Sequence, residues 1–536
     1  MRITKLLPYS FLLLSLTSAA QNKNVYEPSM DVQHYDFTLE VSDDNDELKG
    51  IATTTVKFMQ EVGEISFDLT AKNESGKGME VTGVKENGQP SQFIHNVLRL
   101  KILLHKLSTA GETRIFEISY HGIPTDGLVF SRNKFKQRTI FGDNWPNRAH
   151  NWLPCVDHLS DKASVDFKVT APEHYKVISN GILIEETTLE GHLKFTHWQE
   201  TVALPTKVMV IGLADFAVNY AGNVDCIPVS SWVFPADKKN GFYDYAQALD
   251  ILPFFIKYIG PYAYKKLANV EAITIFGGME NASAIFYNEE SIKGTPGSSD
   301  GLMAHEIAHQ WFGNSATESG WQHVWLSEGF ATEMSHLYLE HKYGKDTLIA
   351  MMKADRHDVI AFSKQRHTPI VDTSEKKNFL ILLNTNSYRK GGWVLHMLRN
   401  RLGDSLFQKT IATYYTTFAG KNASTDELRQ ITEQVSKKDL KTFFQQWLYT
   451  AGNPILDIDW KYDGKKKEVL VNLTQTQPTL FTFPLEISFD NSRSFSTILV
   501  SDKETQAKFP MWSKPLKLVA DPNTNLLFEG TVTELK

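Results

Sequence analysis

Cysteine is almost absent from this chain, which has two, Cys155 and Cys226, among 536 residues. Two cysteines cannot build a disulfide framework or a cysteine-rich metal cluster, and neither stands in metal-ligand spacing. An exported chain could join the two, but a disulfide also needs the two backbones to be close, which a sequence does not show. We expect two buried, unpaired thiols.

An excess of charge of one sign is also missing. Lysine and arginine number 56 against 62 aspartates and glutamates, giving a formal net charge of -6. This balance favours neither nucleic acid nor an anionic membrane as a partner. With 42% hydrophobic and 22% charged residues the composition is that of a globular protein. The length is too great for one hydrophobic core and predicts two to four domains.

Long apolar runs are absent except at the N-terminus. Residues 1–20 hold Arg2 and Lys5, then an apolar run from Leu6 to Leu16, then small residues up to Ala20. This pattern predicts a secretory signal peptide cleaved near Ala20. An uncleaved anchor helix is the alternative, but the run is short for a hydrocarbon layer of ~30 Å. We therefore expect an exported protein without a stable membrane anchor, secreted or, in a Gram-negative host, periplasmic.

Three regions follow the signal segment. Residues 21–216 carry β-branched and aromatic residues, often alternating, between turn signals, as in ASVDFKVTAP, and predict an antiparallel β domain. Residues 217–452 become mixed and then show apolar residues at helical spacing, which predicts a mostly helical domain. Alternation returns over residues 453–536 and predicts a small C-terminal β-sandwich. The expected fold class is multidomain α+β, with no helical domain after the sandwich.

Local signals mark several helix ends in the middle region. Gly344 follows a helical pattern and is expected to be its C-cap. Ser424 and Glu427 form a capping-box signature. The segment TSEKKNFLILLN, residues 373–384, continues the helical pattern.

The stretch HEIAHQWFGN places His305 and His309 four residues apart with Glu306 between them. Residues at this spacing lie on one face of a helix, so both imidazoles can reach one zinc ion. Zinc lowers the pKa of a bound water toward ~7, and Glu306 is placed to take its proton. Glu328, near the start of the next predicted helix, is the expected third ligand. We expect one Zn²⁺, and we expect His323, His336 and His341 to be packing or solvent-facing residues.

A second motif lies upstream in AITIFGGMENASAIFYNEE. Apolar alternation there gives way to five residues that we expect to bind substrate: Gly277, Gly278, Met279, Glu280 and Asn281. Paired glycines allow another backbone to approach a strand edge, as a peptide substrate would. A hairpin turn with a surface carboxylate is the alternative.

Four motifs, GGMEN, HEIAHQWFGN, LSEGFA and NSYRKGG, resemble in order and spacing the M1 family of zinc aminopeptidases. This is the gluzincin group that includes aminopeptidase N and leukotriene A4 hydrolase, and the resemblance covers nearly the whole mature chain. It implies a thermolysin-like catalytic domain over residues 217–452. It also implies an enzyme that removes single N-terminal residues from peptides with a free N-terminus.

The resemblance implies a role for each matching residue. His305, His309 and Glu328 match the zinc ligands, and Glu306 matches the general base. Tyr388 matches the tyrosine that stabilises the oxyanion, which is a role suited to a phenol donor beside zinc. Glu280 matches the acid that holds the α-ammonium of the substrate.

The chain departs from the family pattern in two places. In GDNWPNRAHNWLPC, an alignment on WLPC puts Trp145 where an acid or amide is expected, and Asp143 is the nearby residue that would compensate. Glu280 would then carry more of the amine binding. Many family members also have a C-terminal helical domain, and without one we expect a more open cleft.

Two other classes of function stay open. One is a zinc hydrolase of other specificity, either an endopeptidase or an epoxide hydrolase. The other is a non-catalytic peptide-binding protein on the same fold, which an eroded base or ligand would indicate; none is eroded here. The sequence assigns neither the side-chain preference of the first pocket nor an oligomeric state.

Overall fold

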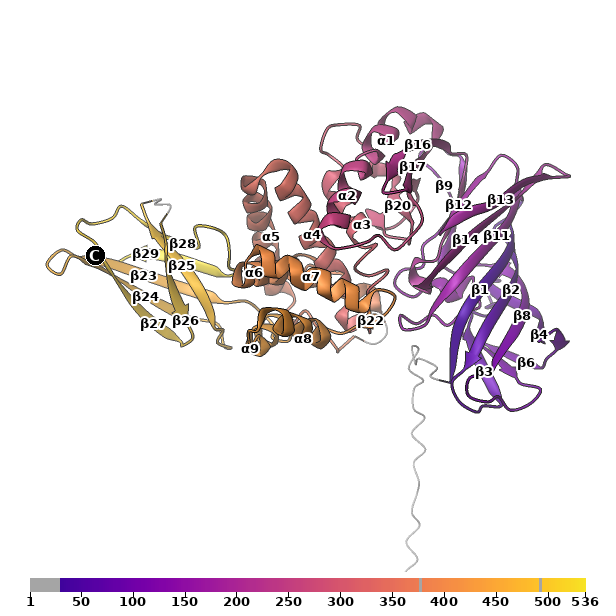
Figure 1. Cartoon of the computed structure of the whole chain (residues 1–536), viewed down its shortest axis with the longest axis horizontal. Helices are drawn as coiled ribbons and strands as arrows, with labels where there is room; N and C mark the ends of the chain where they lie inside the picture. The colour runs from indigo at the N-terminus through magenta and orange to yellow at the C-terminus, as the bar shows by residue number, and fades with distance from the viewer. Residues whose placement is uncertain (1–28, 376–377, 491–493) are drawn as a thin grey trace, which may run out of the picture.

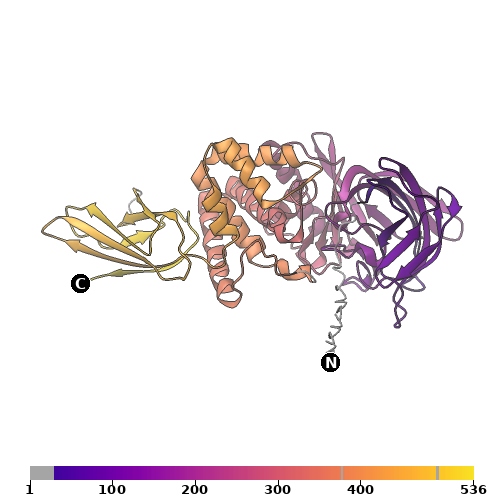
Figure 2. The same cartoon turned by 90° about the horizontal axis from the view of Figure 1, so that it is seen from below.

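The structure, a computed structural model, describes residues 29–375, 378–490 and 494–536. The expected signal peptide, residues 1–20, lies outside this part. Three units follow one another along the long axis of the molecule, an N-terminal β unit, a helical unit and a C-terminal β unit (Figure 1). Figure 2 shows the same order from below. None of the described helices combines the length and the apolar character needed to cross a membrane.

The N-terminal unit is built from three sheets. The largest has eight strands in the order β13-β14-β11-β1-β2-β8-β4-β5, and sheets of four strands (β12-β15-β10-β9) and three strands (β3-β7-β6) accompany it. The strands are β1 (Met30–Glu40), β2 (Leu48–Phe58), β3 (Glu64–Asp68), β4 (Gly78–Glu86), β5 (Gln89–Pro90), β6 (Phe93–Asn96), β7 (Arg99–Leu103), β8 (Thr113–Ile123), β9 (Leu128–Arg132), β10 (Arg138–Gly142), β11 (Lys162–Pro172), β12 (Lys176–Ser179), β13 (Ile182–Leu189), β14 (Leu193–Pro205) and β15 (Ile211–Ala214).

The expectation of a purely antiparallel domain is wrong at one place. β1 pairs in parallel with β11, with Phe37 opposite Phe167, while all other strand pairs of this unit are antiparallel within the described residues. The two strands are separated by more than a hundred residues, and such a long connection can return the chain in the same direction, which a short hairpin cannot.

The helical unit is built around a five-stranded sheet of order β16-β17-β18-β20-β19. β17, β18 and β20 run parallel, and the short β19 pairs antiparallel with β20 at the sheet edge. The elements are β16 (Ala217–Val224), β17 (Ile227–Val233), α1 (Lys238–Tyr245), α2 (Ala248–Tyr258), β18 (Leu267–Ala272), β19 (Gly278–Met279), β20 (Ala284–Asn288), α3 (Asp300–Ala308), β21 (Thr317–Glu318), α4 (Trp325–Tyr343), α5 (Lys345–Gln365), α6 (Gly391–Leu402), α7 (Asp404–Phe418), β22 (Asn422–Ala423), α8 (Thr425–Ser436) and α9 (Lys441–Leu448).

Two predicted helix ends are confirmed and one predicted helix is wrong. α4 ends before Gly344, which has a φ of 90°. Ser424 and Glu427 form both hydrogen bonds of the capping box at the start of α8. The described part of segment 373–384 contains only a short 3-10 turn, η6 (Phe379–Leu382), because its apolar residues pack as a loop beside Trp321 rather than along one helix face.

The C-terminal unit is a sandwich of two sheets, of order β27-β24-β23-β29 and β26-β25-β28. Its strands are β23 (Ile455–Asp463), β24 (Glu468–Gln475), β25 (Phe483–Phe489), β26 (Ser496–Val500), β27 (Glu504–Pro510), β28 (Leu518–Ala520) and β29 (Glu529–Glu534). Its core is continuous with that of the helical unit, since Trp447 of α9 packs on Phe481.

Both cysteines are unpaired, as expected, but only Cys155 is buried. Cys226 is exposed because it lies in the two-residue turn between β16 and β17, where it and Asp225 both have positive φ. Such tight hairpin turns protrude from a sheet into solvent.

Candidate metal and peptide-binding site

Three side chains from two helices converge on one point. His305 lies in α3, His309 directly follows that helix as its C-cap, and Glu328 lies in the first turn of α4. His305 Nε2 is 3.2 Å from His309 Nε2, and the two nitrogens lie 3.4 and 3.3 Å from Glu328 Oε2. Ligands at zinc bond lengths of about 2.0–2.1 Å on a tetrahedron are separated by about 3.3–3.4 Å. The spacing of these three atoms therefore fits one zinc ion.

The orientation of His309 also fits a metal ligand. Its Nδ1 is 3.0 Å from the carbonyl oxygen of Phe312 and 3.0 Å from Oγ of Ser327. Nδ1 therefore carries a hydrogen and donates to Phe312, which leaves the lone pair of Nε2 facing His305 and Glu328. A hydrogen bond to the second ring nitrogen is the usual support of a metal-bound histidine.

The charges around this point favour the binding of a cation. Ligand atoms of Glu280, Glu306 and His309 all lie within 4.8 Å of one another, in addition to the group formed by His305, His309 and Glu328. Burial raises the pKa of Glu306 to about 8. Burial alone would lower the pKa of His309, but the neighbouring carboxylates of Glu328 and Glu280 outweigh it and raise this pKa to about 10. Burial alone would raise the pKa of Glu328, but the two imidazoles hold it well below its ordinary value. Three buried carboxylates around two imidazoles are stabilised when a divalent cation replaces the proton.

The GGMEN residues form the edge of the sheet beside this triad. Gly278 and Met279 are β19, which pairs only with β20 in the described structure. A Cβ on Gly278 would meet the Glu306 carboxylate, with Oε1 at 2.4 Å, whereas a Cβ on Gly277 would have only Leu302 nearby, at 3.8 Å. Gly278 is thus required by packing against Glu306, and Gly277 is not.

Glu280 is buried with one carboxylate oxygen unused. Its backbone carbonyl accepts hydrogen bonds from Nε2 of Gln310 (3.0 Å) and Nδ2 of Asn314 (2.7 Å). Its Oε1 has no hydrogen-bond partner in the described part of the chain, although the side chain is only 4% exposed. A buried carboxylate oxygen without a donor is costly, and a cationic ligand would supply the donor.

Gln310 and Asn314 were not predicted from the sequence. They lie in HEIAHQWFGN, beyond the metal ligands, and hold the strand edge in place. Gln310 Oε1 also accepts the backbone N–H of Ser283, and Asn314 donates its own N–H to the carbonyl of His309. Their position within the same motif was the available signal. Asn281 is the last GGMEN residue. The oxygen and nitrogen of its side-chain amide have no hydrogen-bond partner within the described residues, and its backbone N–H donates to the carbonyl of Met279.

Tyr388 reaches the triad from a third segment. It lies in a single π-helical turn, η7 (Asn386–Lys390), which continues into α6. Such turns are common at functional sites. The Tyr388 ring stacks on His305 with centroids 5.8 Å apart and planes at 12°. Burial, and then the Glu328, Glu280 and Glu306 carboxylates, raise the pKa of Tyr388 well above its ordinary value, so the phenol keeps its hydrogen.

These residues share one pocket of about 230 Å³. Trp145 and Phe276 form an aromatic wall, with ring centroids 6.5 Å apart. The full lining is Trp145, Phe276, Gly277, Gly278, Met279, Glu280, Leu302, His305, Glu306, His309, Glu328, Leu383 and Tyr388.

Asp143 does not compensate for Trp145. It is absent from the pocket lining, and its carboxylate pairs with Arg148 and accepts a hydrogen bond from Thr274 at 3.2 Å. Apart from Glu306 and the expected ligand Glu328, Glu280 is therefore the carboxylate in the pocket lining that is available for an amine.

The other histidines near the motif take no part in the site. His323 hydrogen-bonds Thr425, His336 pairs with Glu333 and Asp355, and His341 stacks on Phe254.

Two family models match the chain. Residues 31–208 match the "Peptidase M1 N-terminal domain" and residues 243–447 the "Peptidase family M1 domain". Two relatives are a leucyl aminopeptidase of Saccharolobus solfataricus, 24% identical over 94% of this chain, and aminopeptidase M1-A of Oryza sativa subsp. japonica, 29% identical over 65%. The matched segments span 65% and 40% of the length of these relatives.

A solved structure has the same fold. The M1 zinc metallopeptidase from Deinococcus radiodurans superposes with a TM-score of 0.68 at 23% identity, over 80% of this chain and 95% of that one. Together, the two matched domains, the common fold and the convergent His305, His309 and Glu328 show that this chain belongs to peptidase family M1.

Proposed function

We propose that the chain is a zinc-dependent aminopeptidase that removes single residues from the N-terminus of peptides. The observation that carries the proposal is the unpartnered Oε1 of Glu280 in a pocket shared with His305, His309 and Glu328. A substrate ammonium would satisfy that oxygen. The relatives are named aminopeptidases, which supports the same activity here.

The chain's own residues then divide the chemistry. His305, His309 and Glu328 would hold the zinc ion, which when bound polarises a carbonyl group and lowers the pKa of water. Glu306, fixed against Gly278, is the general base that takes a proton from the attacking water and returns it to the leaving amine.

Tyr388 supplies the hydrogen-bond donor for the negative charge that develops on the substrate oxygen. Its ring is fixed by stacking on His305, and its phenol is protonated. A donor held in place before the reaction stabilises such charge without reorganisation, and one such donor is worth about 10²–10³ in kcat.

Glu280 sets the position of the cut. Its carboxylate lies within the same 4.8 Å group as Glu306 and His309, so an ammonium held there leaves room for one residue before the reacting carbonyl. The backbone of Gly277 to Met279, at an open sheet edge, would align the peptide by strand addition.

The first side-chain pocket is apolar on the side where Trp145 stands. We propose that Trp145, Phe276 and Met279 form part of its wall, because all three line the site and none carries a charge. Export of the chain, to a periplasm or outside the cell, stays a proposal that rests on residues 1–20.

The test compares aminoacyl chromogenic substrates with the same compounds N-acetylated. Wild type, a chelator-treated sample, Glu306→Gln and Glu280→Gln run in parallel. We expect wild type to cleave only the free-amine compounds, and the chelated and Glu306→Gln samples to be inactive. We expect Glu280→Gln to raise KM by about 10–100-fold, since a hydrogen bond to a charged group is worth about 1.5–3 kcal/mol.

Other outcomes would replace the proposal with a named alternative. Cleavage of the acetylated compounds would indicate an endopeptidase. Binding of zinc with no cleavage of either set would indicate a non-catalytic peptide-binding protein or a hydrolase with a different substrate, such as an epoxide.

A further inference from the structure

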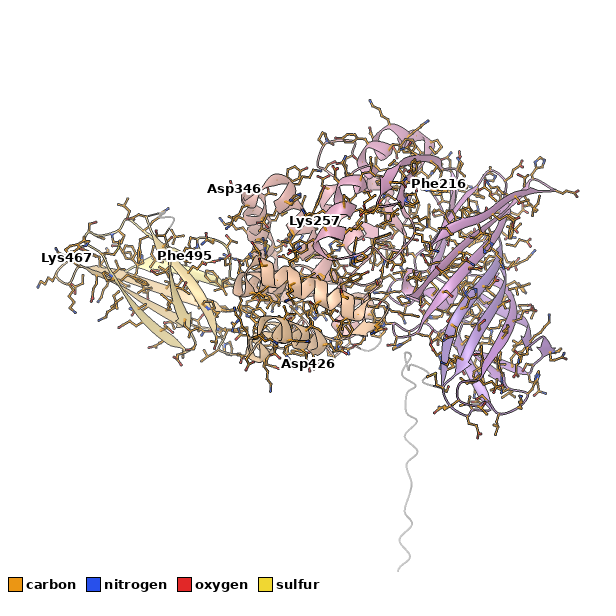
Figure 3. All side chains as sticks on the ribbon, viewed as in Figure 1. Phe216, Lys257, Asp346, Asp426, Lys467 and Phe495 are labelled. Atoms are coloured by element: carbon orange, nitrogen blue, oxygen red, sulfur yellow. The ribbon has the colours of Figure 1, made fainter. Side chains whose placement is uncertain are left out.

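The far end of the C-terminal sandwich carries the most exposed large hydrophobic side chains of the described chain. Leu516 is 89% exposed and Trp512 is 86% exposed. Both lie in the loop between β27 and β28. This loop meets the β23–β24 turn, whose Lys467 marks the end of the long axis opposite the N-terminal unit (Figure 3).

The loop is held in the conformation that exposes these two side chains. Asp490 Oδ1 accepts the backbone N–H groups of Leu516 (2.5 Å) and Lys517 (3.2 Å). The carbonyl of Trp512 accepts the hydroxyl of Tyr462 at 3.1 Å. A solvent-exposed Leu alone is ordinary, but an ordered loop that exposes both an indole and, four residues later, a Leu indicates a contact surface.

Six lysines lie in the same loop, in the adjoining β23–β24 turn or near the end of β27. We call the whole group the lysine tip, and its members are Trp512, Leu516, Lys465, Lys466, Lys467, Lys508, Lys514 and Lys517. All eight are exposed. The Nζ of Lys467 stands 4.4 Å from the centroid of the Trp512 ring.

Half of these lysines have no carboxylate partner. Lys466 and Lys508 each lie 3.9 Å from a carboxylate, of Asp463 and Glu468, and Lys514 pairs with Glu534 at 2.5 Å. In the described part of the chain, Lys465, Lys467 and Lys517 make no ion pair. The tip is therefore locally basic although the chain has a net charge of -6.

We propose that the lysine tip docks the protein onto an anionic lipid bilayer. Indole rings are favoured at the membrane–water interface, where an apolar body and a polar N–H meet. The Leu516 side chain would insert into the apolar layer, and each lysine near an anionic surface strengthens binding about fivefold. An anionic polysaccharide would also attract the lysines, but it offers no apolar layer for Leu516.

The geometry gives the docking a consequence for access to the site. The whole sandwich separates the lysine tip from the helical unit that holds the metal ligands (Figures 1 and 3). A molecule bound by its tip would hold the peptide pocket away from the bilayer and open to solution.

The test is co-sedimentation of the metal-loaded chain, from residue 21 on, with two kinds of vesicle. One is phosphatidylcholine alone and the other contains phosphatidylglycerol as well. We expect binding only to the anionic vesicles, and binding that weakens as salt is raised. Lys465→Glu with Lys517→Glu should weaken partitioning at least about tenfold. Trp512→Ser with Leu516→Ser should weaken it by a similar factor.

Matched controls separate the tip from general charge and hydrophobicity. Lys57→Glu with Lys257→Glu makes the same charge change on other exposed lysines, and Val97→Ser with Leu499→Ser removes other exposed apolar side chains, 78% and 65% exposed. Both control pairs should bind vesicles like the parent. Equal loss in a control pair, no binding of the parent to anionic vesicles at low salt, or binding to a soluble anionic polysaccharide but not to vesicles would each overturn the proposal.

Discussion

Gly278 and Glu306 are in direct contact, so closely that a Cβ on the glycine would lie 2.4 Å from Oε1 of the carboxylate. The strand edge that we propose to align the peptide is therefore in contact with the residue that we propose as the general base. Gly278→Ala should displace the Glu306 carboxylate and lower kcat about 10²-fold, the cost of a misplacement of about 1 Å.

Gly277→Ala is the matched control, because a Cβ there meets only Leu302, at 3.8 Å. It should keep kcat within a few-fold of the parent, and both variants should bind zinc normally. Equal activity of the two variants would show that contact with Gly278 does not position the base.

Ser327 supports the expected zinc ligand His309, because its Oγ is 3.0 Å from Nδ1. Ser327→Ala should lower zinc affinity about tenfold, the low end of the usual range for such a supporting residue, because the Phe312 carbonyl still accepts the Nδ1 hydrogen. Competition with a chromogenic chelator measures the affinity. Ser335→Ala removes a hydroxyl from the same helix that donates to the carbonyl of Thr332, and it should leave zinc affinity unchanged.

Trp145 limits the size of the first side-chain pocket in this proposal. Trp145→Ala should open the wall formed with Phe276. The ratio of kcat/KM for a substrate with a bulky first residue to kcat/KM for one with alanine first should rise about tenfold. Phe379 stacks on Trp321 without lining the pocket, so Phe379→Ala is the control and should leave that ratio unchanged. A uniform loss over all substrates would instead assign Trp145 to stability.

Lys390 should make stability depend on pH. Burial lowers the pKa of Lys390 to about 7, while in the unfolded chain its pKa stays at about 10.4. Below pH 7 the folded chain carries the full cost of a buried ammonium. As pH rises from 7 toward 10.4, the folded chain loses the proton first and the cost declines. Its Nζ donates to the carbonyl of Gly452 at 2.7 Å in either state.

Lys390→Met should therefore be more stable than the parent at pH 6.5. The difference between the two free energies of unfolding should be about 2 kcal/mol smaller at pH 9. Denaturant melts of both proteins at the two pH values measure the difference. Lys438, exposed and bonded to the carbonyl of Arg401, provides the control Lys438→Met, whose difference from the parent should not change with pH. A constant difference for Lys390→Met would contradict the prediction.

The parts of the fold that depend on short stretches of sequence could be predicted. The pair His305 and His309 follows from helix periodicity, and the caps at Gly344 and Ser424 follow from residue type at one position. The parallel pairing of β1 with β11 could not be predicted, because it depends on the path of more than a hundred intervening residues.

The residues that form the walls of the site could not be predicted from the sequence, because they are set by three-dimensional contacts. The sequence placed Asp143 near the pocket, but its carboxylate turns toward Arg148 and Thr274. The π-helical turn that carries Tyr388 has no residue signature of its own, since it arises where the loop packs before α6. The burial of Glu280 and its lack of a donor also appear only in the fold.

The hydrogen bonds of Gln310 and Asn314 to the carbonyl of Glu280 tie the GGMEN strand edge to the turn that follows His309. Both residues follow His309 in the same turn, and Asn314 is tied to the carbonyl of His309 itself. One turn thus supports both sites that we propose, the one for zinc and the one for the substrate ammonium. Unwinding of that turn by heat would release the strand edge together with His309, so damage to one proposed site would disable both.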